Sequence, residues 1–551
     1  MDVPSDIRRY LPYAVIFAAY VAGMWIDVME IDAAQYAAMG RDMMRSGDYL
    51  HLYDHAHGYL DKPPMVFWMS ALSFKLFGVS NWAYKLPSVL FSMMAIYGTE
   101  RLGGLLYNRA TGRLSGLILA STQAFFLMNH DVKTDMYLIG PMVMGLWLLV
   151  SWSRGGLFWH LLLGAAFLGL GMLAKGPLAL IAPGFAIGAD LLLRRDWAAL
   201  FRWQWLLVIP VALLITTPFL IGQYQQYGEH GITFFLWTQS FGRVTGESEW
   251  SNNATAFFFV HSFAWSFLPW TAIFLRGLVH EGIRLFRAGF LLPSRAEGIA
   301  IGGFLLVFTA LCFSKFKLPH YIFVTYPFAA ILTAAFAMEM HKNLVLQPWK
   351  KFFQVFHRVF WFLAVILVLL LAFGAFPEQP LLPKIGFMLL AAVVSIDMFR
   401  AKNEWARFLW PTAVGFGLCN LLLNLTLYPA VMSYQSTAQA GKYVSSLEPR
   451  PRVFGFIISG RALDFYAADN VLPIPGPVYF KPLLKKTDAI VYTNDDGLRQ
   501  IRERGIQFEF LETYAHNPPT RMSLMFLNPA TRPSVLKPRY LLHLPKQDLP
   551  R

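Results

Sequence analysis

The sequence predicts a polytopic α-helical membrane protein that ends in a smaller α/β domain. Three observations support this fold class. The chain of 551 residues is 56% hydrophobic and only 15% charged, whereas about a quarter of the residues in a soluble domain are charged. Apolar runs of membrane-spanning length recur between Leu11 and Leu427. After Leu427 the chain becomes polar, and short β-like runs alternate with turn residues.

The formal net charge of +14 does not indicate nucleic acid binding in a chain this apolar. It predicts basic cytoplasmic loops and attraction to anionic membrane lipid. The two cysteines, Cys312 and Cys419, both fall inside predicted spans, so no disulfide framework is indicated. Arg8 and Arg9 precede the first apolar run, which lacks a small-x-small cleavage site. We therefore expect a retained first span with the N-terminus in the cytoplasm.

The first span is expected at residues 11–26. The next apolar run, residues 65–77, is too short to cross about 30 Å of hydrocarbon, so we expect an interfacial or re-entrant helix there. The further expected spans are residues 83–106, 114–128, 136–152, 157–173, 178–192, 205–222, 256–275, 297–313, 321–340, 356–374, 381–398 and 408–427. These segments predict about thirteen transmembrane helices.

The basic residues test this topology. If residues 65–77 do not cross, the loops that carry Arg113, Arg154, Arg195, Arg284 and Lys350 all lie in the cytoplasm, as the positive-inside rule requires. The chain is therefore expected to be N-in and C-out. Residues 1–428 form the transmembrane domain, with outer-face loops at 27–82 and 223–255. Residues 429–551 form an α/β domain on the same outer face, with strand-like runs at 452–458, 489–493, 508–511 and 524–527.

The outer-face stretch at residues 29–65 is rich in acids and tyrosines. Asp32 and Tyr36 are four residues apart, so they share a face if residues 31–45 form the amphipathic interfacial helix that their pattern predicts. Farther on, Pro63 and Pro64 hold Lys62 in an extended segment, where its ammonium can meet a phosphate. The alternative is an ordinary solvated loop.

Three more polar elements share this face. Asp131 and Asp135 lie between two spans, either as functional acids or as interfacial anchors. Arg243 lies in the aromatic loop 223–255, where it either faces a lipid phosphate or snorkels from an aromatic belt. Lys315 and Lys317 depart from the positive-inside pattern, which argues for a bound anion.

This mixture of cations and acids suits chemistry on a lipid-linked phosphate. The cations would hold phosphate, and the acids would contact sugar or acceptor. A transporter would instead place ionisable residues near the middle of its spans, and most predicted spans have none there.

Several motifs resemble the GT-C membrane glycosyltransferases. They are Asp-xxx-Tyr at 32–36, Tyr-Leu-Asp-Lys-Pro-Pro-Met at 59–65, Phe-Gly-Val-Ser-Asn-Trp-Ala-Tyr-Lys-Leu-Pro-Ser at 77–88, Leu-Ala-Lys-Gly-Pro at 173–177, Phe-Leu-Pro-Trp at 267–270 and Lys-Phe-Lys-Leu-Pro-His-Tyr at 315–321. The last motif, followed by Tyr326-Pro327, looks most like the branch of the bacterial 4-amino-4-deoxy-L-arabinose lipid A transferases. The protein O-mannosyltransferases belong to the same branch of the superfamily. The motifs cover residues 29–327; the rest of the chain agrees in architecture only.

The resemblance implies a GT-C fold and an undecaprenyl-phosphate-linked sugar as donor. It implies transfer of aminoarabinose to a lipid A phosphate on the periplasmic side of the inner membrane, which gives resistance to polymyxin and cationic peptides. The implied catalytic residues are Asp32, Lys62 and Asp135, and the implied substrate-binding residues are Tyr36, Tyr59, Arg243, Lys315 and Tyr321. Many relatives carry two adjacent acids in the first loop. Here Ile31 separates Glu30 from Asp32, which leaves the role of Glu30 open.

A mechanistic hypothesis follows. A hydroxyl acceptor needs a general base, which Asp32 could supply. A phosphate, with a second pKa near ~6, is already ionised. Asp32 and Asp135 would then orient groups or pair with the sugar's ammonium, while Lys62 and Arg243 would stabilise the leaving prenyl phosphate. Attack opposite the leaving group predicts inversion at the anomeric carbon.

We expect no required cofactor, although His51, His55 and His57 leave a zinc site open as an alternative. The expected partners are the donor, lipid A and membrane lipids, with no nucleic acid, and the chain is expected to be a monomer. The alternative functions are a protein O-mannosyltransferase or another polyprenyl-phosphate-sugar transferase, and a lipid flippase. A flippase would move lipid without depending on Asp32.

Overall fold

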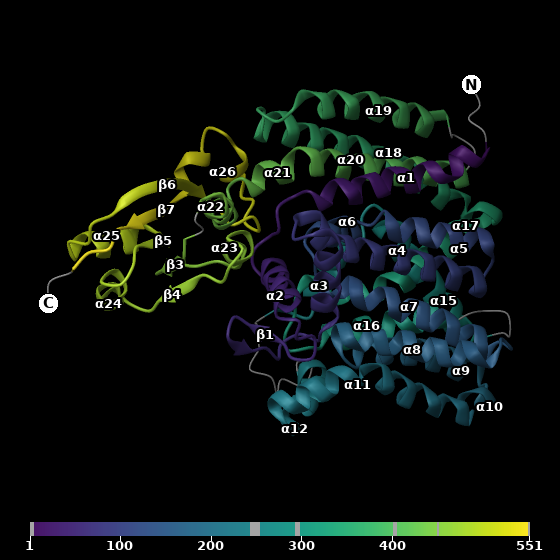
Figure 1. Ribbon diagram of the computed structural model, residues 1–551. Helices are drawn as coiled ribbons and strands as arrows, with labels where there is room; N and C mark the ends of the chain where they lie inside the picture. Colours follow the sequence, from purple (N-terminus) through teal and green to yellow (C-terminus); the bar gives the residue numbers. More distant parts are fainter. Residues whose placement is uncertain (1–4, 243–253, 293–297, 401–404, 449–450, 549–551) are drawn as a thin grey trace.

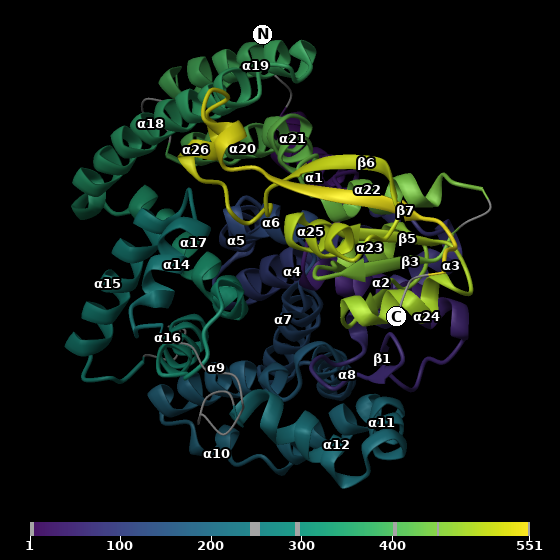
Figure 2. The ribbon, with the colours of Figure 1, turned by 90° about the vertical axis from the view of Figure 1, so that its left-hand side faces the viewer.

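The computed structural model describes residues 5–242, 254–292, 298–400, 405–448 and 451–548. Figure 1 shows a large bundle of helices, with a sheet domain at one end that is formed by the C-terminal part of the chain. The N-terminus lies at the end of the bundle away from the sheet domain (Figure 1). The second view confirms that the sheet domain lies over α2 and α3 (Figure 2).

The helices of the bundle run mostly along one direction (Figure 1). They are α1 (Ser5–Met24), α4 (Asn81–Leu106), α5 (Arg109–Ala120), α6 (Gln123–His130), α7 (Thr134–Ser153), α8 (Phe158–Lys175), α9 (Leu178–Arg194), α11 (Val208–Tyr227), α14 (Phe258–Ser266), α15 (Thr271–Arg287), α16 (Ile299–Cys312), α17 (Tyr326–Lys342), α18 (Gln347–Leu369), α19 (Leu381–Arg400), α20 (Trp405–Leu425) and α21 (Leu427–Met432). Shorter helices α10 (Trp197–Leu200) and α12 (Glu229–Thr233) flank α11.

Within the described ranges, seven helical segments are long and apolar enough to cross a membrane. Three shorter apolar helices, Tyr10–Met24, Met65–Phe77 and Ile299–Cys312, accompany them. The protein is therefore a helical membrane protein, as the sequence predicts. Its predicted count of thirteen spans and its orientation stay predictions.

Two expected spans are each divided into two helices. The segment 114–128 breaks between α5 and α6, and the segment 256–275 breaks between α14 and α15. Pro269 has no N–H to continue a helix, and the two breaks face each other. The Trp270 indole N–H donates to Ser121 Oγ at 2.8 Å, and the backbone N–H of Gln123 donates to the Leu268 carbonyl at 3.0 Å. One backbone donor at the first break and one backbone carbonyl at the second thus satisfy each other.

Residues 29–77 contain two helices. The predicted amphipathic helix is present as α2 (Asp32–Ser46), and the short apolar run forms α3 (Met65–Phe77). The short hairpin β1 (Tyr53–Asp54) and β2 (His57–Gly58) lies between them. Ala33, Ala37 and Tyr36 are all buried, so α2 packs one face against the bundle.

The C-terminal domain contains a five-stranded sheet with the order β4-β3-β5-β7-β6. Its elements are α22 (Ser436–Ser445), β3 (Val453–Phe456), α23 (Arg461–Tyr466), β4 (Leu472–Ile474), α24 (Phe480–Leu484), β5 (Ala489–Thr493), α25 (Asp495–Glu503), β6 (Glu509–His516), α26 (Leu524–Leu527) and β7 (Lys537–Leu544). β3 pairs in parallel with β4 and β5, whereas β7 is antiparallel to β5 and β6. This confirms the predicted α/β character.

The prediction of a strand at 524–527 is wrong, because these residues form the one-turn helix α26. The Ser523 hydroxyl accepts a hydrogen bond from the Phe526 N–H and caps the turn. Phe526 is buried against Phe376 at the end of the helical bundle. A single buried residue in a short apolar run suits a turn of helix as well as a strand, so periodicity could not separate the two.

The sheet domain is joined to α2 by buried polar contacts. Arg41 on α2 is completely buried, and its guanidinium donates to the carbonyls of Asp464 and Phe465 on α23. Arg461 on α23 pairs with Asp54 of the hairpin at 2.6 Å. These contacts fix α2, and therefore its first residue Asp32, between the bundle and the sheet domain.

Candidate active site

A cavity opens where α2, α7, α8 and the segment before α17 meet. Its lining residues are Asp32, Tyr36, Lys62, Lys133, Thr134, Lys175, Leu178, Ile181, Phe185, Gln239, Val307, Ala310, Leu311, Ser314, Leu318, His320 and Tyr321. One wall is polar and carries acids, lysines and a histidine. The other is aliphatic and aromatic and comes from α9 and α16. The cavity thus has a charged end and an apolar end.

Asp32 starts α2, where the helix N-terminus favours its negative charge. Lys133 Nζ lies 3.2 Å from Asp32 Oδ2 and 3.5 Å from Asp131 Oδ2. Burial lowers the pKa of the Lys133 ammonium, but the carboxylates of Asp131 and Asp32 outweigh that effect, so its pKa is raised. Lys133 is therefore a cation held between two acids at the edge of the cavity.

Asp135 lies in the first turn of α7, directly behind the cavity wall, and its side chain is only 1% exposed. Lys175 Nζ, at the end of α8, lies 2.6 Å from Asp135 Oδ1, and His320 Nε2 lies 3.8 Å from Oδ2. The same ammonium lies 4.3 Å from the centre of the Tyr321 ring, a cation–π distance. Asp135 thus organises Lys175 and His320 against Tyr321.

Lys62 enters the cavity from the extended segment before α3. Its ammonium lies 2.5 Å from Asp61 Oδ2, and the Gln239 amide donates to the Asp61 carbonyl at 2.6 Å. Only 16% of the Lys62 side chain is exposed. Pro63 and Pro64 stiffen this segment. The sequence prediction that Lys62 is held in a defined place agrees with this geometry.

The two predicted tyrosines stand side by side on Phe67 of α3. The ring of Tyr36 lies 5.7 Å and the ring of Tyr59 5.8 Å from the Phe67 ring, both edge to face. Tyr36 lines the cavity, whereas Tyr59 is half-buried outside the lining set. Burial, followed by the charges near it, raises the pKa of the Tyr36 hydroxyl well above its ordinary value. That hydroxyl is therefore neutral and able to donate a hydrogen bond.

The remaining predicted residues lie elsewhere. Arg243 is outside the described residues. Lys315 is exposed and is not among the residues that line the cavity. Its neighbour Lys317 is buried, and the ammonium donates to the carbonyls of Ser314 at 2.5 Å and Ala254 at 3.1 Å. Both residues are lysines, so the sequence could not show that Lys315 is exposed whereas Lys317 binds carbonyls of two loops.

Three cavity residues did not stand out in the sequence. They are Lys133, Lys175 and His320. Lys175 and His320 each lie within a motif that carries the resemblance, on the predicted outer face. Their place in these motifs is the signal that could have identified them as site residues. Lys133 lies two residues before Asp135, between the two acids that drew the interpretation there.

Glu30 turns away from this cavity. Its carboxylate accepts hydrogen bonds from the Thr437 hydroxyl at 2.7 Å and from the Ala462 N–H at 3.1 Å. Burial raises the pKa of Glu30. Glu30 thus contacts the sheet domain and does not act as a second acid beside Asp32.

The histidines considered for zinc take separate partners. His51 pairs with Asp48 at 2.8 Å, and His55 lies between Asp54 at 3.2 Å and Asp464 at 3.4 Å. His57 is exposed at the start of β2. The three rings therefore do not converge on one point, and the expectation that no cofactor is required stays a prediction.

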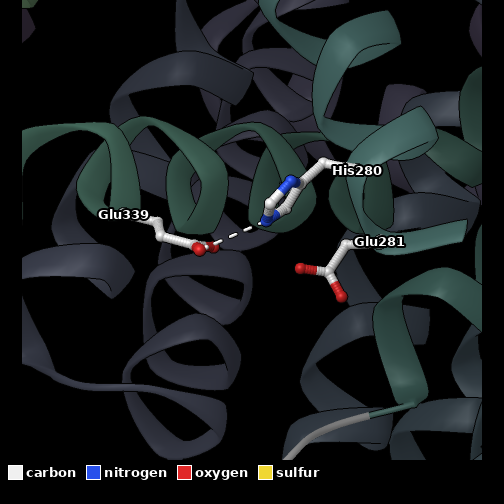
Figure 3. A group of neighbouring side chains, drawn as sticks. All are labelled: His280, Glu281 and Glu339. Carbon is white, nitrogen blue, oxygen red and sulfur yellow. Dashed lines mark hydrogen bonds and ion pairs between the residues drawn. The ribbon is translucent and has the colours of Figure 1, made fainter. Parts of the chain in front are cut away.

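Among the described residues, a different group of side chains approaches the geometry of a metal site. His280 and Glu281 on α15 and Glu339 on α17 point toward one another, with ligand atoms within 4.8 Å (Figure 3). His280 Nε2 lies 3.2 Å from Glu339, while Glu281 pairs with Arg284 at 2.6 Å. Glu339 lies about 20 Å along α17 from its first residue, Tyr326, and none of the three side chains lines the cavity. This group therefore contributes nothing to the cavity chemistry.

The sequence matches one family model and several curated relatives. Residues 61–221 match the family described as dolichyl-phosphate-mannose-protein mannosyltransferase. An undecaprenyl phosphate-alpha-4-amino-4-deoxy-L-arabinose arabinosyl transferase of Serratia proteamaculans is 25% identical over 429 residues, which cover 74% of this chain and 75% of the relative. A protein of the same name from Edwardsiella ictaluri is 25% identical over 61% of this chain and 60% of its own length.

A comparison with solved structures identifies the fold of the chain. The crystal structure of ArnT from Cupriavidus metallidurans bound to undecaprenyl phosphate superposes with a TM-score of 0.74, at 20% identity, over 97% of both chains. The apo form of that protein matches equally well in TM-score. The chain is therefore a membrane protein with the fold of the GT-C glycosyltransferases. Within that class, its sequence is similar to the arabinosyl transferases named above.

Proposed function

We propose that this protein transfers 4-amino-4-deoxy-L-arabinose from undecaprenyl phosphate to a phosphate of lipid A. The observation that carries the proposal is the single cavity that combines Asp32, Lys62 and Lys175 with an apolar wall. The arabinosyl transferases to which the chain is similar are named for an undecaprenyl phosphate sugar. A donor of this kind has a charged head and a long isoprenoid chain, and the two ends of the cavity suit the two parts.

The apolar wall supports the donor assignment. It consists of Leu178, Ile181, Phe185, Val307 and Leu311 from α9 and α16. Such a surface stabilises a prenyl chain by the hydrophobic effect, with no need for directional contacts. The phosphate of the donor then comes to the charged end, where Lys62 is held.

At the charged end, each group has a definite task. Lys62 stabilises the negative charge that develops on the leaving prenyl phosphate. Asp32 orients the sugar, whose amino group is a cation and favours a carboxylate partner, and Asp135 holds Lys175 and His320 in place from behind the wall. Tyr36 and Tyr321 line the space for the sugar ring. The ionised acceptor phosphate attacks the anomeric carbon opposite the leaving group, so the configuration inverts.

The site faces the periplasm in this proposal. The positive-inside distribution supports a cytoplasmic N-terminus, thirteen crossings and an outer C-terminal domain. Lipid A phosphates are then reached from the outer leaflet of the inner membrane. The cavity is built within one chain, so no second copy is needed and we expect a monomer.

Mass spectrometry of lipid A tests the proposal. Expression of the chain in a polymyxin-sensitive host should add aminoarabinose to lipid A, and Lys62→Ala should abolish the addition while the protein still inserts. Unmodified lipid A with the wild-type chain would contradict the function. Full activity of Lys62→Ala would contradict the phosphate role of that lysine.

A protein acceptor is the second candidate, because the family match at residues 61–221 is named for a protein mannosyltransferase. The donor end of the cavity would serve either reaction. Glycoprotein mass spectrometry from the same cells separates them: glycosylated protein with unmodified lipid A would favour the second candidate.

A further inference from the structure

A second cavity adjoins the first at the edge of the sheet domain. Its lining residues are Glu30, Ile31, Asp32, His55, Ala56, His57, Asp131, Lys133, Thr437, Ser459, Gly460, Arg461, Asp464, Val471, Leu472, Pro473, His516, Pro518, Pro519 and Thr520. Asp32 and Lys133 line both cavities. These two residues therefore mark the junction between the spaces.

Twelve of the twenty residues that line the second cavity are polar or charged, and they come from the first loop, the segment before α7 and the sheet domain. His55 and Arg461 supply positive charge, and Glu30, Asp131 and Asp464 supply negative charge. These charged groups suit a hydrated head group. The two cavities thus favour different occupants, which would meet at Asp32 and Lys133.

The junction has an excess of negative charge without Lys133. Asp32 and Asp131 both lie within 3.5 Å of the Lys133 ammonium, and Oδ1 of Asp131 is buried with no hydrogen-bond partner in the described structure. An anionic acceptor that approaches Asp32 would meet these carboxylates. An ammonium has three N–H donors, so Lys133 can hold Asp32 and still donate to an oxygen of the acceptor.

We propose that Lys133 recognises the acceptor phosphate and positions Asp32 at the junction of the two cavities. The inference rests on the proposed function and assigns separate lysines to the two phosphates: Lys62 to that of the donor and Lys133 to that of the acceptor. Lys62 lines the first cavity, whereas Lys133 is accessible from both. Lys133 makes the enzyme selective for anionic acceptors, because an uncharged hydroxyl can accept a hydrogen bond from the ammonium but gains no charge attraction.

Steady-state kinetics on the purified protein in nanodiscs test this role, with the undecaprenyl phosphate sugar and lipid A varied separately. Lys133→Met should raise the KM for lipid A by at least about tenfold, because it removes a charge-assisted hydrogen bond. Inhibition by undecaprenyl phosphate should stay at the wild-type value, and the donor KM should rise less than the acceptor KM, because only the sugar of the donor meets Asp32. Lys133→Arg keeps the charge and should recover most of the acceptor affinity.

Lys75→Met is the matched control, since Lys75 is exposed on α3 and lines neither cavity. It should leave both KM values unchanged. An unchanged acceptor KM in Lys133→Met, or an equal loss of donor and acceptor affinity, would overturn the inference. If the wild-type protein transfers no sugar to lipid A, the proposed function fails with it; wild-type transfer with a silent Lys133→Met overturns the inference alone.

Discussion

Replacing Asp135 with asparagine should both destabilise the protein and abolish transfer. The Asp135 carboxylate is 1% exposed and lies 2.6 Å from the Lys175 ammonium, whose side chain is 14% exposed. Removing one partner of a buried ion pair leaves the other charge in a poorly solvated place, at a cost of about 3–5 kcal/mol. Lys175 keeps its contact with the Tyr321 ring at 4.3 Å. We therefore expect the lower end, about 3 kcal/mol.

An exposed ion pair in the sheet domain provides the control for the effect of burial. Asp496 and Arg499 in the sheet domain lie 2.5 Å apart, but their side chains are 60% and 66% exposed. Exposed ion pairs contribute about 1 kcal/mol or less. Asp496→Asn should therefore leave stability almost unchanged, although the same chemical group is removed at a similar distance.

Thermal unfolding of the detergent-solubilised protein, followed by tryptophan fluorescence, measures the effect. Asp135→Asn should lower Tm by about 2–3 °C for a chain of this size. The double variant Asp135→Asn with Lys175→Met should recover most of the loss, because no charge is left unpaired, yet remain inactive. An unchanged Tm in Asp135→Asn, or an equal fall in Asp496→Asn, would refute the reasoning.

Two further predictions concern the packing of the outer loop and of the bundle. Hydrogen bonds to Asp464 and Asp54 raise the pKa of His55 to about 9, above its ordinary value of 6.5. Because the folded pKa is the higher one, the stabilisation is complete below about pH 6.5 and is lost as pH rises through about 9. Thermal unfolding across this range should show that loss in wild type, and His55→Gln should remove it; an identical pH dependence in both proteins would exclude His55. In the bundle, a Cβ at Gly112 of α5 would lie 2.4 Å from the Glu100 carbonyl of α4, whereas a Cβ at Gly104 meets nothing within 4 Å. Gly112→Ala should reduce the yield of folded protein in fluorescence-detected gel filtration, and Gly104→Ala should not; equal yields would show that α4 and α5 can separate without cost.

Much of the fold follows from local sequence patterns. The period of apolar residues predicted α2, and the length of the next apolar run predicted the short helix α3. The change in composition after Leu427 predicted the α/β domain. The two divided spans could not be foreseen, because each break is satisfied by the other through contacts such as Trp270 to Ser121. Hydropathy within a window carries no information about such distant partners.

The candidate site, like the fold, was predicted only in part. Asp32, Tyr36, Lys62 and Tyr321 line one cavity, although they come from separate parts of the chain. Motifs and topology placed them on one face, which was enough to group them. The partners Lys133 and Lys175 were missed, because the pairs with Asp32 and Asp135 span 101 and 40 residues. Tertiary packing alone decides which lysine meets which acid.

Transfer in a reconstituted system tests the central claim most directly. Purified protein in liposomes, supplied with the undecaprenyl phosphate sugar and lipid A, should release undecaprenyl phosphate and form aminoarabinose-modified lipid A in equal amounts. Asp32→Asn should reconstitute equally well and form neither product above background. Full transfer by Asp32→Asn, or release of undecaprenyl phosphate without any modified lipid A from the wild-type protein, would contradict the account.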